Sequence, residues 1–185
     1  MRLLSTVAFL GAAFALATAS AQARTFDLTL LGANEPNGAG QLGQGDPDAM
    51  AVGSVTLDPV TDMVTWDFNY SNISGGAISG FHIHGPGATP TTNVGIYIPF
   101  TLSSTTVPNG TEQGMLMTTD ISDLGAKIDR VLSNPSEFYI NLHSNGTGGF
   151  PGGAVRATLP EPGALSLLAL AGLGLLRRGR RASRA

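Results

Sequence analysis

The sequence predicts an all-β domain, an antiparallel β-sandwich or barrel, with one short helix at about residues 120–134. Three observations predict this class: apolar and polar residues alternate in several short segments, clusters rich in Gly, Pro, Asn and Asp separate these segments, and a single segment has helical spacing. The 185-residue chain contains no Cys, so its hydrophobic core must stabilise the domain without disulfide bonds.

The alternation predicts the individual strands. Segment 26–32, FDLTLLG, and segment 63–70, MVTWDFNY, each place their large apolar side chains on one face. Segments 52–58, 93–100 and 153–159 behave similarly. The clusters that predict turns lie at 58–62, 71–76, 85–90, 107–114 and 146–153.

The single helix is predicted by apolar residues at helical spacing, which are Ile121, Leu124, Ile128, Val131 and Leu132. Asp120 or Ser122 can cap its start, and Pro135 prevents its continuation. The Gly-rich run 32–45 has no periodicity, so we expect a long loop there.

We expect both ends of the chain to lie outside this domain, which leaves residues 24–159 as the β domain. Residues 1–23 have a basic start at Arg2, an apolar run and then small residues, the pattern of a secretory signal peptide with an N-terminal signal helix. Cleavage after Ala21 or Ala23 fits the small residues, and we favour Ala23. The pattern therefore predicts export.

The other end, residues 160–185, carries three features in order: the tripeptide Pro160, Glu161 and Pro162, an apolar stretch at 163–176, and a cluster containing Arg177, Arg178, Arg180 and Arg181. An arginine cluster behind a short hydrophobic helix favours retention of that cluster on the cytoplasmic side of the inner membrane. The segment resembles the PEP-CTERM sorting signal of Gram-negative bacteria. The resemblance implies export machinery and an exosortase as partners, transient insertion into the inner membrane, and delivery to the cell surface or outside the cell.

The body of the chain is acidic. Residues 24–159 hold four Lys and Arg and twelve Asp and Glu, a net charge of −8. A surface of this sign repels nucleic acid, so we expect no nucleic-acid partner.

The histidines are the best candidates for a functional site. His82 and His84 are two residues apart in a predicted strand and share one face, and His143 alternates with apolar residues in segment 138–144. If these two strands are neighbours, the three imidazoles gather on one polar face, where they suit Zn²⁺ or Cu²⁺. Hydrogen-bonded structural or solvent-exposed histidines on a polar face are the leading interpretation, a single metal site is the second, and a catalytic base is the third.

The segments FHIHGPGA, FYINLHS and PGGAVRATL resemble the successive signatures of the CHRD domain, first described in chordin. The resemblance spans about residues 25–159 and implies an extracellular all-β module. It covers His82, His84, Gly85, Pro86, Tyr139, Asn141, His143, Pro151, Gly152, Gly153 and Arg156. Ala154 and Ala157 depart from the family pattern, which has Glu and Gly there.

The segment GFHIHGPG is also similar to the Gly-Phe-His-Val-His segment of copper-zinc superoxide dismutases. Those enzymes need six histidines, an aspartate and a disulfide, whereas this chain has three histidines and no Cys, which argues against a working dismutase. Arg156 is expected either to form a salt bridge at the rim or to orient the histidine face.

Together these features predict a non-enzymatic, exported CHRD-domain protein with no resident cofactor. We expect it to bind an exopolysaccharide or a protein of the extracellular matrix. The alternative is a Zn- or Cu-binding domain with oxidoreductase-like activity through His82, His84 and His143.

Overall fold

The computed structural model describes residues 22–145 and 153–161. The predicted signal helix, the apolar stretch 163–176 and the arginine cluster lie outside these residues. The strands are β1 Arg24–Leu31, β2 Met50–Asp58, β3 Met63–Ser71, β4 Ile78–His84, β5 Ile96–Pro99, β6 Gly110–Leu116, β7 Tyr139–Ser144 and β8 Gly153–Thr158. The helices are α1 Leu124–Ser133 and the short 3-10 helices η1 Gly32–Asn34 and η2 Pro135–Glu137.

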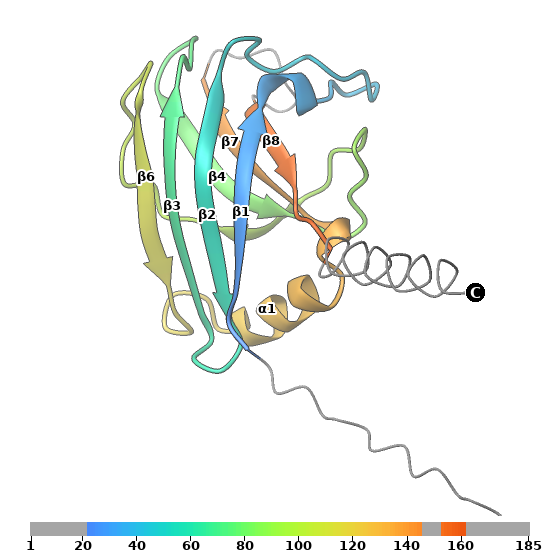
Figure 1. Ribbon diagram of the computed structural model, residues 1–185, viewed down its shortest axis with the longest axis vertical. Helices are drawn as coiled ribbons and strands as arrows, with labels where there is room; N and C mark the ends of the chain where they lie inside the picture. Colours follow the sequence, from blue (N-terminus) through green and yellow to red (C-terminus); the bar gives the residue numbers. More distant parts are fainter. Residues whose placement is uncertain (1–21, 146–152, 162–185) are drawn as a thin grey trace, which may run out of the picture.

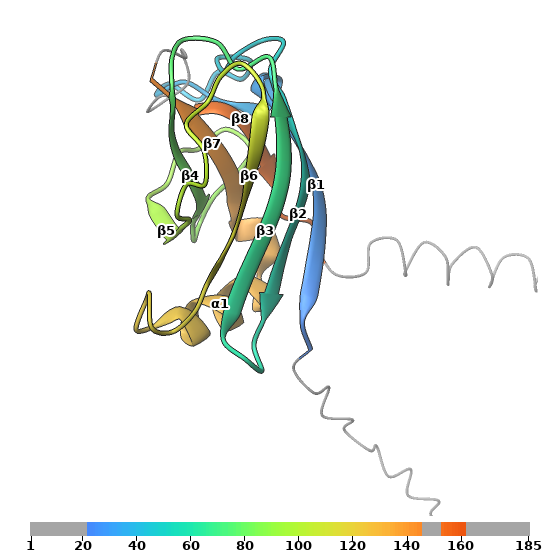
Figure 2. The same ribbon diagram turned by 90° about the vertical axis from the view of Figure 1, so that its left-hand side faces the viewer.

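All eight strands form one antiparallel sheet in the order β5-β4-β7-β8-β1-β2-β3-β6. The sheet curls, so that β1, β2, β3 and β6 form one wall and β4, β7 and β8 form the wall behind it (Figures 1 and 2). The prediction of an all-β antiparallel fold with one helix is confirmed, and the architecture is a half-barrel built from a single sheet.

The core fills the space between the two walls because each strand turns its apolar residues inward. Trp66 on β3 stacks on Phe100 with ring centroids 4.4 Å apart, and Phe81 on β4 meets the edges of both Phe68 and Phe100. Phe81 and Ile83 are buried on the inner face of β4, which directs His82 and His84 to the opposite face.

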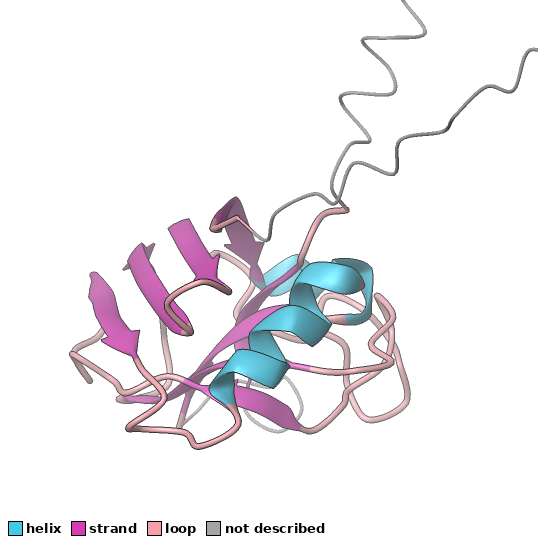
Figure 3. Ribbon diagram, turned by 90° about the horizontal axis from the view of Figure 1, so that it is seen from below, coloured by secondary structure: helices cyan, strands magenta, loops and turns pink. Residues whose placement is uncertain are grey.

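Helix α1 closes one end of the half-barrel (Figure 3). Leu124, Ile128 and Val131 are fully buried in the core, as their spacing predicts. The helix begins later than expected, because Asp120 uses its carboxylate to accept the Met117 amide proton in the preceding turn. Neither predicted cap is the residue that precedes the helix, which is Asp123.

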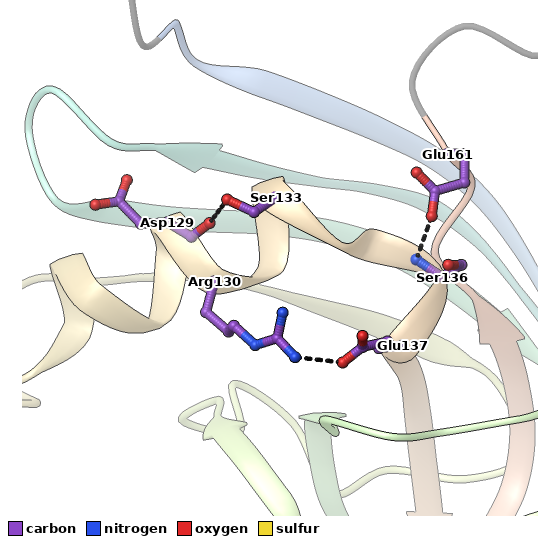
Figure 4. Close-up of polar contacts among 6 residues, drawn as sticks. All are labelled: Asp129, Arg130, Ser133, Ser136, Glu137 and Glu161. Carbon is purple, nitrogen blue, oxygen red and sulfur yellow. Dashed lines mark hydrogen bonds and ion pairs between the residues drawn. The ribbon is translucent and has the colours of Figure 1, made fainter.

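The C-terminal end of α1 is fixed by polar contacts (Figure 4). Ser133 donates a hydrogen bond to the carbonyl of Asp129, and Arg130 pairs with Glu137 in η2. The Ser136 amide donates to the carboxylate of Glu161 over 3.3 Å, so the segment after β8 lies against this end of the helix.

One strand contradicts the sequence prediction. Residues 107–114 were expected to be a turn, but β6 begins at Gly110 and pairs with β3 along seven residues. The strand has few apolar residues because it lies at the edge of the sheet, and only Glu112 and Leu116 are buried. Its polarity therefore hides it from an analysis that relies on alternating hydrophobicity.

Candidate metal site

The site begins with the pairing of β4 and β7, which are neighbours in the sheet. Gly80 lies opposite His143 and His84 lies opposite Tyr139, so the side chains of the two strands meet on the outer face. One ring nitrogen from each of His82, His84 and His143 lies within 4.8 Å of the other two. The predicted gathering of three imidazoles on one polar face is confirmed.

His84 and His143 make the closest approach, with 3.3 Å between their Nε2 atoms. The Nδ1 atom of His84 lies 2.9 Å from the carbonyl oxygen of Val94. A carbonyl can only accept, so Nδ1 carries the proton and Nε2 presents its lone pair to His143. This is the arrangement of a metal-ligating histidine, whose second ring nitrogen donates to a carbonyl or a carboxylate.

His82 completes the cluster and is the most accessible member, being half-buried whereas His84 and His143 are buried. Its buried Nδ1 atom has no hydrogen-bond partner. Burial, followed by the charges of His143 and His84, lowers the pKa of His82 from 6.5 to about 3. Burial likewise lowers the pKa of His84. Both rings are therefore neutral at physiological pH, the form in which imidazole binds metals.

Gly80 makes room for the His82 ring. A Cβ atom at this position would lie 2.4 Å from Cε1 and 2.9 Å from Nε2 of His82. Glycine is therefore the residue that lets the ring lie back over the strand toward His143.

A stack of three planar groups supports the cluster from one side. The His84 ring lies parallel to the Tyr139 ring with centroids 4.8 Å apart, and the Arg156 guanidinium lies 3.4 Å from the Tyr139 centroid on β7. A cation over an aromatic face is attracted by the quadrupole of the ring. The register Asn141↔Arg156 between β7 and β8 creates this stack.

Arg156 also fixes the loop that follows β4. The side chain is 1% exposed and donates to the carbonyls of Thr89 and Thr92 and to Oδ1 of Asn93. The prediction of a salt bridge at the rim is wrong, because the guanidinium is buried under this loop. Since the same loop supplies the Val94 carbonyl to His84, the alternative prediction of an orienting role agrees with these contacts.

The polar side chains on the outer face of β4, β7 and β8 form a layer that includes the three histidines, Asn141 and Arg156. A buried carboxylate, which the sequence patterns did not predict, lies in this polar layer. Glu35 is 0% exposed and accepts a 2.8 Å hydrogen bond from Nδ2 of Asn141. Burial raises the pKa of Glu35 to about 7, although Arg156 and Asn141 act in the opposite direction. Any Cβ atom at Gly153 would lie 2.4 Å from the Glu35 carboxylate, which explains a glycine at that position.

Burial is the largest influence on the pKa of Arg156 and lowers it, whereas the negative charge of Glu35 raises it. Glu35 lies in the Gly-rich loop 32–45, which the sequence correctly suggests is mostly irregular, apart from η1. A single acidic residue in an aperiodic segment gives no signal that it folds over a sheet.

A pocket of about 510 Å³ opens over the histidine cluster. Its walls are the three histidines together with Ser79, Asn93, Val94, Gly95 and Ile96. The three histidines therefore line a pocket of the size that small molecules occupy, with His84 and His143 buried and His82 half-buried.

The other predicted residues lie around this layer or outside it. Gly85 and Pro86 follow β4 directly and are joined by a cis peptide bond. Pro151, Gly152, Pro162 and the predicted arginines 177, 178, 180 and 181 lie outside the described residues. Ala23 is exposed just before β1, and Pro160 and Glu161 are exposed after β8.

The part of the chain that the structure describes contains no helix long and apolar enough to cross a membrane. No curated protein matches the chain, and no solved structure matches it. The family model of the CHRD domain matches residues 26–159, which include every strand but the first two residues of β1. The chain therefore belongs to the CHRD domain family.

Proposed function

We propose that the chain is an exported CHRD-domain binding protein in which His82, His84 and His143 hold one Zn²⁺ or Cu²⁺ ion. The observation that carries the proposal is the convergence of three ring nitrogens within 4.8 Å of one another in the lining of a pocket. Three imidazoles suit both metals.

The distances support this assignment. Two nitrogens bound about 2.0–2.1 Å from a tetrahedral ion lie about 3.3 Å from each other, by simple geometry. The Nε2 atoms of His84 and His143 are 3.3 Å apart. In the metal-free state a proton can bridge these nitrogens, and a metal ion would take its place. The ring of His82 must move closer, which its half-exposed position permits.

Binding is a better proposal than catalysis. Among residues 22–145 and 153–161, no Asp or Glu oxygen joins the histidine cluster, so the site has no carboxylate to act as a general base. The expected non-enzymatic role therefore stays our proposal, in preference to an oxidoreductase-like activity.

Export and sorting belong to the same proposal and rest on the two terminal segments. Pro160 and Glu161, the first two residues of the proposed exosortase signal, are exposed at the end of β8. The carbonyl of Pro160 accepts a 2.6 Å hydrogen bond from Arg24, the first residue after the proposed cleavage at Ala23. Such exposure suits a site that a processing enzyme must reach. Cell fractionation and mass measurement of the mature chain test this part, and an unprocessed chain confined to the cytoplasm would contradict it.

Thermal unfolding tests metal binding. Saturating Zn²⁺ or Cu²⁺ should raise the melting temperature of the full chain, and a chelator should reverse the rise, because a ligand that binds only the native state stabilises it by about 2.7 kcal/mol at 100 times its dissociation constant. His82→Ala should lose most of the rise. Ser79→Ala, on the same strand and in the same pocket, should keep it. An equal rise in both variants would contradict the assignment.

A further inference from the structure

We infer that an ion held by the three histidines keeps a coordination position open toward the 510 Å³ pocket, and that this position takes a carboxylate. This inference rests on the proposed metal site and names the class of ligand that the site recruits.

The chain supplies only three strong donors to the ion. All three histidines and all thirteen Asp and Glu residues fall within residues 22–145 and 153–161, and the chain has no Cys. Within that part of the chain the cluster of ligand atoms contains His82, His84 and His143 alone. Zinc sites with three protein ligands leave the fourth position to water or to an external ligand.

The charge of such a site favours an anion. Three neutral imidazoles leave both positive charges of the ion uncompensated, and a bound cation is then the dominant local charge. Glu35, which is buried in the same polar layer, is already engaged by Asn141 and lies in the field of Arg156. The ion therefore lacks a counter-charge from the protein and attracts one from outside.

The pocket wall favours a carboxylate over phosphate. Phosphate is held in proteins by several charged or backbone donors at once. The cation of this layer, Arg156, uses its donors on the loop carbonyls of Thr89 and Thr92. The wall offers instead the apolar side chains of Val94 and Ile96 and the hydroxyl of Ser79. A ligand with a single negative charge and an otherwise uncharged structure therefore suits this wall better than phosphate does.

The pocket is large enough for a carboxylate that is part of a larger molecule. Ligand pockets for small molecules typically have volumes of about 300–1,000 Å³, and Gly95 leaves the rim open because nothing lies within 4 Å of a Cβ atom placed there. A carboxylate attached to a sugar ring, as in an acidic polysaccharide, can therefore reach the ion as well as a free acid can. Both sources present the same carboxylate group.

The test uses the full chain loaded with Cu²⁺, whose ligand-field absorption changes when a coordinating atom is exchanged. Sodium acetate, galacturonate, galactose and phosphate are titrated separately, and metal content is measured in each sample. Acetate and galacturonate should shift the band in a saturable manner, and galactose should not. Galacturonate binding at least tenfold tighter than acetate would identify the sugar acid as the source, and equal binding would identify the carboxylate alone.

Ile96→Trp, which narrows the pocket, should weaken acetate binding at least tenfold in copper-loaded protein. The matched control is Val52→Trp on β2, since Val52 is 45% exposed and is not among the residues that line the pocket. Copper uptake without any response to acetate, or phosphate binding tighter than acetate, would overturn this inference and leave the metal site intact. Failure to take up either copper or zinc would instead overturn the proposed function itself.

Discussion

Glu35 shows how one residue can complete a polar layer from a distant loop. Its carboxylate is fully buried, yet the hydrogen bond it accepts comes from Asn141, 106 positions away. Desolvation is the largest influence on the group and raises its pKa to about 7. A buried acid that is half ionised near neutral pH makes the stability of the domain depend on pH.

Replacement of Glu35 by Gln tests that dependence. The folded pKa of about 7 lies above the ordinary value of 4.5, so the folded chain binds more protons than the unfolded chain between these values. Stability contributed by Glu35 is thus complete below pH 4.5 and is lost as the pH rises toward 7, by on the order of 3 kcal/mol. Denaturant unfolding of metal-free protein between pH 5 and 8 should show this loss as a growing difference between the wild type and Glu35→Gln, because the histidines contribute equally to both curves. Parallel curves would refute it.

His82 should make the free energy of unfolding change with pH in the opposite direction, rising as the pH rises. The pKa of His82 falls from 6.5 to about 3 on folding, so the unfolded chain binds more protons between these values. Metal-free Glu35→Gln, in which Glu35 no longer opposes this effect, should therefore lose stability as the pH falls below about 6.5, whereas in the wild type the two contributions should largely offset each other between pH 4.5 and 6.5.

Two glycines beside the site offer a matched comparison. A Cβ atom at Gly80 would lie 2.4 Å from the His82 ring, whereas one at Gly95 would meet nothing within 4 Å. Gly80→Ala should therefore displace the ring and weaken metal binding by about 10- to 100-fold, as loss of a supporting contact does at other metal sites. Gly95→Ala should bind metal as the wild type does. Calorimetric titration with Zn²⁺ measures both, and equal affinities would show that the position of the His82 ring is unimportant.

At the scale of elements, the loop between β4 and β5 depends on β8. Arg156 on β8 donates to three acceptors in that loop, and the loop in turn holds His84 through Val94. The metal site is thus built from two neighbouring strands and is oriented by a third.

Loss of the Arg156 guanidinium should loosen this loop. Arg156→Met removes the charged donor to the carbonyls of Thr89 and Thr92 and the cation over the Tyr139 ring, which should lower the free energy of unfolding by about 2–4 kcal/mol. Arg130→Met is the matched control, because the Arg130–Glu137 pair is 39% and 38% exposed and should contribute less than about 1 kcal/mol. Hydrogen exchange should quicken at residues 92–95 in the first variant alone. Similar losses in both variants would contradict a specific role for Arg156.

Sequence patterns predicted those elements whose residues contact the core. The alternation in 63–70 marks β3 because Val64, Trp66, Phe68 and Tyr70 are all buried. The pattern missed β6, whose edge position requires few apolar residues, and it could not fix the start of α1, where Asp120 forms a turn instead of a cap. Local hydrophobicity reports burial, and these features depend on hydrogen bonds.

At the scale of the whole molecule, the curled sheet separates two environments. Apolar side chains fill the space between its walls, and the outer face of β4, β7 and β8 carries a layer of polar side chains. The loops at 32–46 and 86–95 cover this face (Figures 1 and 2). The three histidines could be predicted because period-two alternation fixes their face. The loops that cover this face could not be predicted, because Glu35, Asn93 and Val94 reach the site through loop conformations that follow no periodic pattern.

The most direct measurement of the central claim is the metal content of the full chain, purified without an affinity tag or chelator after exposure to Zn²⁺ or Cu²⁺. Elemental mass spectrometry should find about one ion per wild-type chain and none in a His82→Ala, His84→Ala and His143→Ala triple variant. His82→Ala alone, which removes the half-exposed ligand and leaves the two buried rings in place, should bind metal weakly and show that the loss does not require unfolding. A wild-type chain without metal, or a triple variant with as much metal as the wild type, would contradict the account.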